Sequence, residues 1–110
     1  MPTPPKQLLP GTLDMLVLRT IATQAMHGYG IAQQIQRISQ DVLKVEEGSL
    51  YPALQRMRQK GWLTAEWRQT PNNQRARYYA ITTKGRRQLG VEQQDFEQII
   101  AAIRRVMNPG

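Results

Sequence analysis

The sequence predicts a single, mainly helical domain of the α+β class, and three observations support this prediction. The chain has 110 residues, which is enough for one compact domain with a modest core and too few for two. Four segments repeat apolar residues at the spacing of an α-helix. A further region alternates apolar and polar residues on both sides of a turn, as a β-hairpin does.

The composition excludes several classes of protein. No apolar run approaches the roughly 20 residues that a membrane-spanning helix needs. Residues 1–10 lack the basic head and apolar stretch of a secretory signal. Because there is no cysteine, disulfides, a thiol nucleophile and a thiolate metal site are excluded. We therefore expect a cytoplasmic protein that neither spans nor binds a membrane.

The first helix is predicted to follow a flexible arm. Residues 1–10 contain four of the seven prolines, which favours an extended or disordered segment. Thr12 can then cap a helix that runs to about Ala25. Because apolar side chains surround most of this helix, it is either a central core helix or a helix that partly faces a second subunit. These side chains belong to Leu13, Met15, Leu16, Val17, Leu18 and Ile21.

The second and third helices have clear apolar faces. After a glycine-containing turn at residues 26–30, isoleucines recur at helical spacing up to Ile38. A short link at residues 41–45 leads to a third helix that opens at Gly48 to Ser49, has Pro52 in its first turn and ends at Gly61. Its core face consists of Leu50, Ala53, Leu54 and Met57. Polar side chains occupy the flank and the far side, namely Tyr51, Gln55, Arg56 and Gln59.

A basic hairpin and a long helix complete the predicted domain. Apolar residues alternate with polar ones over residues 63–68, and after a turn at residues 71–74 the chain returns over residues 77–81. We expect Trp62, Trp67 and Tyr79 to lie in the core. A last helix, capped by Thr82 or Thr83, is predicted to run to about Met107. At about 37 Å it is longer than the body needs, so part of its apolar stripe is expected to pack on a second copy.

Positive charge is concentrated in one stretch of the chain. The net charge is +7, from fifteen Lys and Arg against eight Asp and Glu. Residues 44–87 contain ten of the basic and three of the acidic residues, whereas the charges of the remainder balance. A localised positive field suits a polyanion such as nucleic acid. The alternative is a generally basic, solvated surface.

The order of three helices, a basic hairpin and a long helix is that of a winged helix-turn-helix domain with an added dimerisation helix. Four local sequences sharpen this interpretation: MHGYGI at residues 26–31, EGSLYPAL at 47–54, KGWL at 60–63 and RYYAITTKG at 77–85. In this order and spacing they resemble the PadR family of bacterial transcriptional regulators, over Leu9 to about Leu89. The C-terminal part is similar to that of the smaller members, which carry a single terminal helix.

The resemblance implies a homodimer that binds inverted-repeat operator DNA. Such regulators usually repress transcription and are often released by a small molecule, for example a phenolic compound. On this basis residues 1–10 form a flexible arm, residues 11–82 a winged helix-turn-helix domain, and residues 83–107 a dimerisation helix.

Candidate DNA contacts lie on the third helix and on the hairpin, or wing. Gln55 and Arg56 carry the donors and acceptors that read base edges in the major groove. Ser49, Tyr51 and Lys60 are candidates for phosphate contacts. On the wing, the long polar side chains suit a DNA backbone or a minor groove; they belong to Asn72, Asn73, Gln74, Arg75 and Arg77. For each residue alone, simple solvent exposure is the alternative.

The last helix carries the candidate subunit contacts. We expect the dimer to use Leu13, Leu16, Phe96, Ile100, Ile103 and Met107. In similar small regulators a flat aromatic or cationic effector lies between the subunits, which here implicates Met15, Phe96, Ile99 and Ile100. Phe96 is the only aromatic residue of this helix, and the alternative is that these four residues are simply part of the dimer core.

The sequence contains no recognisable catalytic constellation. His27 is the only histidine and has no thiolate or imidazole partner, so neither a metal site nor a cofactor is expected, and His27 is interpreted as a packing or hydrogen-bonding residue. Two hypotheses of function follow. The first is a sequence-specific repressor, and the second is a winged-helix module that binds protein partners or nucleic acid without sequence preference.

Overall fold

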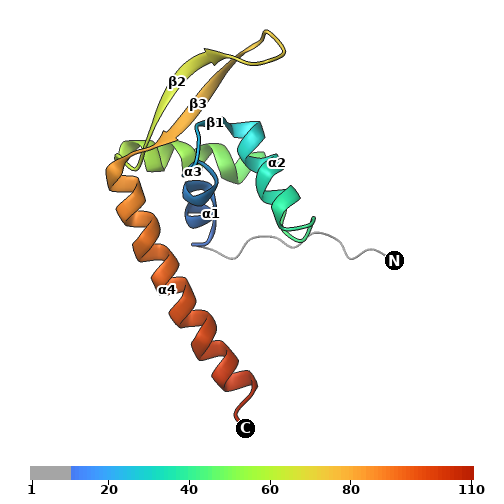
Figure 1. The fold of residues 1–110 in the computed structure, drawn as a ribbon, viewed down its shortest axis with the longest axis vertical. Helices are drawn as coiled ribbons and strands as arrows, with labels where there is room; N and C mark the ends of the chain where they lie inside the picture. The colour runs from blue at the N-terminus through green and yellow to red at the C-terminus, as the bar shows by residue number, and fades with distance from the viewer. Residues whose placement is uncertain (1–10) are drawn as a thin grey trace.

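The computed structural model describes residues 11–110, so the predicted arm at residues 1–10 lies outside the described residues. The described chain forms an α+β fold, as predicted, in which the hairpin and the last helix extend in opposite directions from a helical body (Figure 1). The elements are α1 (Leu13–Thr20), β1 (Met26–His27), α2 (Gly28–Ile38), α3 (Glu47–Gln59), β2 (Leu63–Gln69), β3 (Arg75–Ile81) and α4 (Thr83–Met107).

The core lies where the first three helices meet the base of the sheet. The predicted apolar face of α3 is confirmed, because Leu50, Leu54 and Met57 are fully buried and Ala53 is nearly so. α1 contributes Val17 and Leu18 to the same cluster, and α2 and the sheet complete it. Fully burying one such large side chain contributes about 1.5 to 3 kcal/mol, so this cluster supplies the main stabilisation of the body.

Tertiary pairing shortens α1. The helix ends at Thr20, although the apolar pattern predicts that it continues to about Ala25. The chain leaves the helix there because the following segment crosses to the sheet, where Met26 pairs with Tyr79 and His27 with Tyr78. The predicted turn at residues 26–30 therefore contains a two-residue strand. A strand this short has no detectable periodicity in the sequence.

His27 also sets the start of α2. Its Nδ1 atom accepts a hydrogen bond of 3.0 Å from the backbone N–H of Gly30, as an N-cap residue does. Its ring lies edge-on to Tyr78, with 5.4 Å between the ring centroids. The interpretation of His27 as a packing and hydrogen-bonding residue is confirmed.

α3 begins earlier than predicted. It starts at Glu47 rather than at Gly48 to Ser49, which places Pro52 in the second turn instead of the first. Proline lacks an N–H, so the carbonyl of Gly48 loses its partner within the helix. Gly48 and Pro52 are both exposed, and solvent can satisfy this carbonyl. The exposed position explains why the proline is tolerated there.

The sheet has the strand order β1, β3, β2, and its hairpin reaches beyond the core. β2 and β3 pair from Leu63 with Ile81 to Gln69 with Arg75. Tyr79 is buried and Trp62 packs partly buried against the core, as predicted. Trp67, however, is 56% exposed, so its prediction as a core residue is wrong. It lies on the core-facing side of the hairpin, as its alternation implies, but beyond the edge of the helical body.

One junction connects the body to both projecting elements. The Thr82 hydroxyl accepts a hydrogen bond of 2.9 Å from the N–H of Gly85 and donates one of 2.6 Å to the carbonyl of Gly61. Gly61 ends α3 with a φ of 78°, a conformation that favours glycine. At Gly85 the backbone of α4 approaches that of Trp62 so closely that a Cβ atom would lie 1.9 Å from the Trp62 carbonyl oxygen.

No helix among residues 11–110 is long and apolar enough to cross a membrane. α4, the longest of them with 25 residues, instead leaves the body and exposes one side of its apolar stripe. In Figure 1 its C-terminal half has no other helix or strand of residues 11–110 beside it.

We predict that Gly85→Ala lowers the free energy of unfolding by about 3 kcal/mol, because the added methyl group must displace backbone rather than a flexible side chain. Gly90→Ala is the matched control in the same helix. Nothing lies within 4 Å of its Cβ position, so the control is expected to stabilise α4 by about 0.5 to 1 kcal/mol. Urea denaturation at one protein concentration measures both. Equal stability of the two variants would contradict the close packing of Gly85.

Candidate nucleic-acid interface

The outward face of α3 is a narrow stripe of small and amide-bearing residues. Gly48, Pro52, Gln55 and Gln59 recur at helical spacing opposite the buried face, and all four are exposed. The Gln55 side chain has no hydrogen-bond partner among residues 11–110 and carries both a donor and an acceptor. This stripe is therefore a surface that can approach a partner closely and form hydrogen bonds with it.

Arg56 does not share that outward stripe, because it turns toward α1. Its Nη1 and Nη2 atoms donate to the two carboxylate oxygens of Asp14 at 2.6 and 2.7 Å. This hydrogen bond raises the pKa of the Arg56 guanidinium, although its partial burial acts in the opposite direction. The pair uses two of the five N–H donors of Arg56 and holds its guanidinium on the side of α3 that faces α1. The ion pair joins residues 42 positions apart, and no local pattern in the sequence indicates it.

Glu92 of α4 completes a charged junction with Asp14 and Arg56. One of its carboxylate oxygens accepts from Gln88 at 3.3 Å, whereas the other is buried and has no partner among the described residues. Burial raises the pKa of Glu92 above its usual range; repulsion from Asp14 adds to this, whereas the Gln88 hydrogen bond and nearby Arg56 lower it. The junction therefore links the first, third and last helices through charge.

Ser49 and Lys60 lie nearer to the side of α3 that carries Arg56 than to the outward stripe. Ser49 is seven residues before Arg56 and so shares its face. Lys60 lies over the Trp62 ring, with its Nζ atom 4.7 Å from the ring centroid. Both side chains are exposed, and their roles as phosphate contacts stay predictions.

The tip of the wing is shaped by its own hydrogen bonds. Asn73 has a φ of 63°, a conformation that asparagine tolerates better than most residues. Its side-chain oxygen accepts from the Gln69 amide at 2.6 Å, and its backbone N–H donates to Thr70 at 2.9 Å. The neighbouring side chains of the tip are exposed, namely Asn72, Gln74 and Arg75. The predicted contact residues thus project from an ordered loop.

A hollow, here called the wing pocket, joins α3 to the wing. It has a volume of about 370 Å³ and is lined by His27, Gly28, Tyr29, Tyr51, Trp67, Ala76, Arg77 and Tyr79. Arg75 and Arg77 both lie over the Trp67 ring, with guanidinium carbons 5.3 and 5.7 Å from its centroid. The pocket brings predicted residues of both elements to one surface. Sequence reasoning missed Tyr29 and Trp67, because apolar alternation does not reveal where a core ends.

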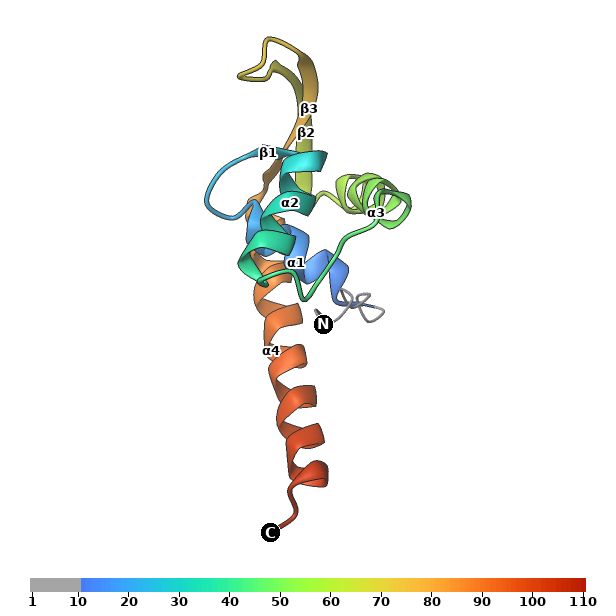
Figure 2. The same cartoon turned by 90° about the vertical axis from the view of Figure 1, so that its right-hand side faces the viewer.

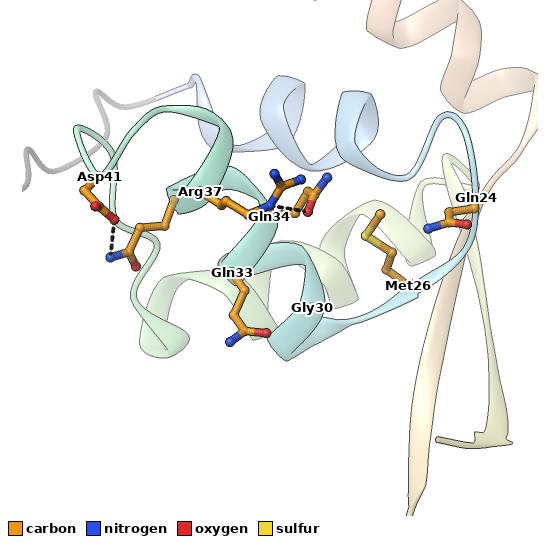
Figure 3. Close-up of a pocket in the computed structure, with 8 residues that line it drawn as sticks. Gln24, Met26, Gly30, Gln33, Gln34, Arg37 and Asp41 are labelled. Atoms are coloured by element: carbon orange, nitrogen blue, oxygen red, sulfur yellow. Dashed lines mark hydrogen bonds between the residues drawn. The ribbon is translucent and has the colours of Figure 1, made fainter. Parts of the chain in front are cut away.

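A second hollow lies beside α2 (Figure 3), with a volume of about 640 Å³. The polar side chains around it largely satisfy one another. Gln36 donates to Asp41 at 3.2 Å, and Arg37 donates to Gln34 at 3.3 Å, as the dashed lines in Figure 3 show. Its lining consists of Gln24, Met26, Gly30, Gln33, Gln34, Gln36, Arg37 and Asp41.

The predicted subunit contacts lie on α1 and α4, which are adjacent in the fold (Figure 2). Leu13, Met15 and Leu16 of α1 pack only partly against the core. On α4, Phe96 and Ile100 are half-buried, whereas Ile103 and Met107 are 51% and 72% exposed. Ile99, named with the candidate effector site, is also largely exposed. Apolar surface is therefore continuous along one side of α4.

A comparison with known families gives one match that covers most of the chain. The model of the "Transcriptional regulator PadR-like family" matches residues 17–91. An uncharacterized protein of Lysinibacillus sphaericus is 29% identical over 79 residues, which is 72% of each chain.

Solved structures share the same winged-helix fold. A transcriptional regulator from Clostridium thermocellum superposes with a TM-score of 0.79 at 22% identity, over 86% of this chain and 92% of that one. A PadR-like transcriptional regulator from Bacillus cereus gives a TM-score of 0.75 at 24% identity, over 89% of this chain and 93% of that one.

We predict that Asp14 and Arg56 are energetically coupled by about 1 to 2 kcal/mol, because the pair is bidentate and Asp14 is only 13% exposed. A double-mutant cycle of Asp14→Asn and Arg56→Gln, followed by urea denaturation at constant protein concentration, measures this coupling. The exposed pair Glu66 and Arg68 is the control, with an expected coupling below about 0.5 kcal/mol. Equal coupling in the two cycles would show that the charged junction does not hold α3 on α1.

Proposed function

We propose that this chain, which belongs to the transcriptional regulator PadR-like family, is a homodimeric repressor that reads an inverted-repeat DNA operator. The family consists of transcriptional regulators and not of enzymes. The observation that carries the proposal is that Tyr51 of α3 and Arg77 of the wing line one pocket, while the amide of Gln55 is exposed on the outward stripe of α3.

In the proposed complex, α3 lies in the major groove and Gln55 reads a base edge. A glutamine amide can donate to and accept from adenine at once, which discriminates by about 1 to 3 kcal/mol against other bases. Gly48 and Pro52 flank it on the exposed stripe and have little side chain to hold the helix away from DNA. Tyr51, on the flank of the helix toward the wing, and Ser49 serve as phosphate contacts.

The wing supplies sequence-independent affinity. Arg75 and Arg77, with Asn72 to Gln74 at the tip, contact the DNA backbone or an adjacent minor groove. Each phosphate that a cation neutralises releases counterions, so affinity falls steeply as salt rises. The confinement of the excess charge to residues 44–87 supports this role.

Arg56 and Lys60 support the reading helix from its side. In this proposal Arg56 stays paired with Asp14 and holds α3 against α1, while base recognition depends on Gln55. Lys60, exposed at the end of α3, contacts a phosphate.

The second subunit packs on the exposed apolar side of α4 and on α1. This interface covers the apolar side chains of α1 that the core covers only in part. In the proposal it is formed by Leu13, Leu16, Phe96, Ile100, Ile103 and Met107. Two-fold symmetry then sets the half-sites about one DNA turn apart, roughly 34 Å.

An effector between the subunits belongs to the same proposal. A small aromatic or cationic molecule bound near Met15, Phe96, Ile99 and Ile100 would contact both α1 and α4 and so change the spacing of the two reading helices. The regulator acts in the cytoplasm, where bacterial DNA is found.

We predict that Gln55→Ala removes sequence preference with little loss of non-specific affinity, because the lost amide contacts a base and not a phosphate. The operator is first selected from a random duplex library with the unaltered protein. Fluorescence anisotropy then compares the selected duplex with a shuffled one, and the variant is expected to bind the selected duplex about tenfold more weakly.

Arg75→Gln is the matched control on the wing. It is expected to weaken binding to both duplexes alike and to reduce the salt dependence by about one counterion. If the unaltered protein selects no sequence, or if Gln55→Ala weakens both duplexes equally, the chain is a non-specific or protein-binding winged-helix module instead.

We further predict that Ile103→Glu converts the protein to a monomer, because it places a charge in the centre of the exposed apolar stripe. Ala101→Glu, on the opposite face of α4 and also exposed, is expected to leave the dimer intact. Sedimentation velocity measures both, and a dimer that survives Ile103→Glu would contradict the proposed interface.

A further inference from the structure

Three of the aromatic rings that line the wing pocket lie outside the core. Tyr29 is 59% exposed, Trp67 is 56% exposed and Tyr51 is 45% exposed, and all three line the pocket with the buried Tyr79. Exposed large apolar side chains are common singly, but a group of them around one hollow marks a binding surface. Rings of this kind bind flat partners well because they lose little conformational freedom.

These walls are held in place by the surrounding fold. Gly28 has no side chain, and a Cβ atom there would lie 2.8 Å from the Tyr51 ring, so the glycine makes room for that ring. Tyr29 stacks on His27, with ring centroids 6.5 Å apart, and its hydroxyl accepts from Gln33 at 3.0 Å. The pocket is therefore largely formed before any partner arrives.

Two polar side chains of the pocket, Arg77 and Tyr51, can donate hydrogen bonds. Arg77 lines it, and its Nε–H has no hydrogen-bond partner among the described residues. Burial raises the pKa of Tyr51, and repulsion from Glu47 adds to this, so its hydroxyl keeps its proton and can donate. None of the lining residues carries a carboxylate. An anionic group is thus the natural partner of the polar side of the pocket.

A pocket with aromatic walls and cationic donors matches the two parts of a nucleotide, its flat base and its phosphate. A phosphate of duplex DNA needs donors but no stacking surface, because the bases of a duplex are stacked inside the helix. Proteins that bind unpaired nucleotides instead combine a positive groove with aromatic side chains on which the bases stack. The volume of about 370 Å³ lies at the lower end of the range for ligand pockets, which suits one such unit.

We propose that the wing pocket binds one unpaired nucleotide, with its base against Trp67 and Tyr51 and its phosphate on Arg77. The same chemistry is offered by a free mononucleotide and by a nucleotide of a single strand. This binding goes beyond the reading of an operator. Because the pocket lies between α3 and the wing, an occupant also competes with duplex DNA, and that consequence alone rests on the proposed function.

The test compares three probes on the full chain: a single-stranded oligomer of five thymidines, an abasic oligomer of the same length and charge, and thymidine 5′-monophosphate. Trp62→Phe leaves Trp67 as the remaining tryptophan, so quenching of its fluorescence reports on the pocket. We expect the thymidine oligomer to bind about tenfold more tightly than the abasic one and to quench Trp67. If the mononucleotide also binds and quenches Trp67, a free nucleotide is a sufficient ligand. If only the oligomer quenches Trp67, the site is one for single strands.

Variants separate stacking from charge. Trp67→Ala is expected to weaken oligomer binding about tenfold, Trp67→Phe to retain most of it, and Trp62→Phe, outside the pocket, to leave it unchanged. Circular dichroism checks that each variant is folded. Equal affinity for the thymidine and abasic oligomers, or an unchanged affinity in Trp67→Ala, would overturn the proposal and leave only electrostatic attraction. Tighter binding of benzoate than of the mononucleotide would overturn the assignment to nucleotides.

The outcome is independent of operator recognition. Gln55→Ala is expected to bind the thymidine oligomer as the unaltered chain does, because Gln55 does not line the pocket. A protein that selects no duplex sequence but binds the oligomer through Trp67 would refute the proposed operator and keep the nucleotide site. A protein that selects a duplex but binds no oligomer through Trp67 would do the reverse.

Discussion

The close backbone contact between α4 and Trp62 is the constraint on which the rest of the structure depends. Gly85 allows this contact because it has no side chain, and Thr82 fixes it with one hydrogen bond to each side. The contact lies where the chain passes from α3 to β2 and from β3 to α4. It therefore sets the directions of the wing and of α4 relative to α3, and these directions define the two surfaces on which the proposed function relies.

Charge is divided between two sides of α3. On one side the Asp14, Arg56 and Glu92 junction uses a basic residue to hold helices together, so Arg56 is occupied inside the protein. On the other side the outward stripe carries amides and small residues, and among residues 11–110 the wing residues Arg75 and Arg77 have no carboxylate partner, whereas Arg68 pairs with Glu66. The domain has a strongly positive net charge, and Arg56 is used to hold helices together. The basic residues of the wing remain on the surface, where they can attract a polyanion.

The length of the hairpin gives the wing its chemical character. Its base is part of the core, where Tyr79 is buried, and its outer part continues with the same side facing inward, where Trp67 stays largely exposed. Trp67 and Arg77 thus line the same pocket as Tyr51 of α3, and Arg75 lies near the Trp67 ring. The hairpin is longer than the core beneath it, and its side chains keep alternating along its whole length. Its outer inward-facing side chains therefore line a pocket instead of joining the core.

The sequence by itself determined the order of the four helices and the hairpin, the core face of α3 and a threonine cap at residue 82 or 83, because these depend on local periodicity and local hydrogen bonding. The structure selects Thr82 as that cap. It also pointed to the wing and the third helix through charge and local motifs. Only the tertiary structure decided where α1 ends, that β1 exists, that Trp67 is exposed and that Arg56 pairs with Asp14. Each of these depends on residues far apart in the chain meeting in space, and a single sequence without its fold contains no local signal of such meetings.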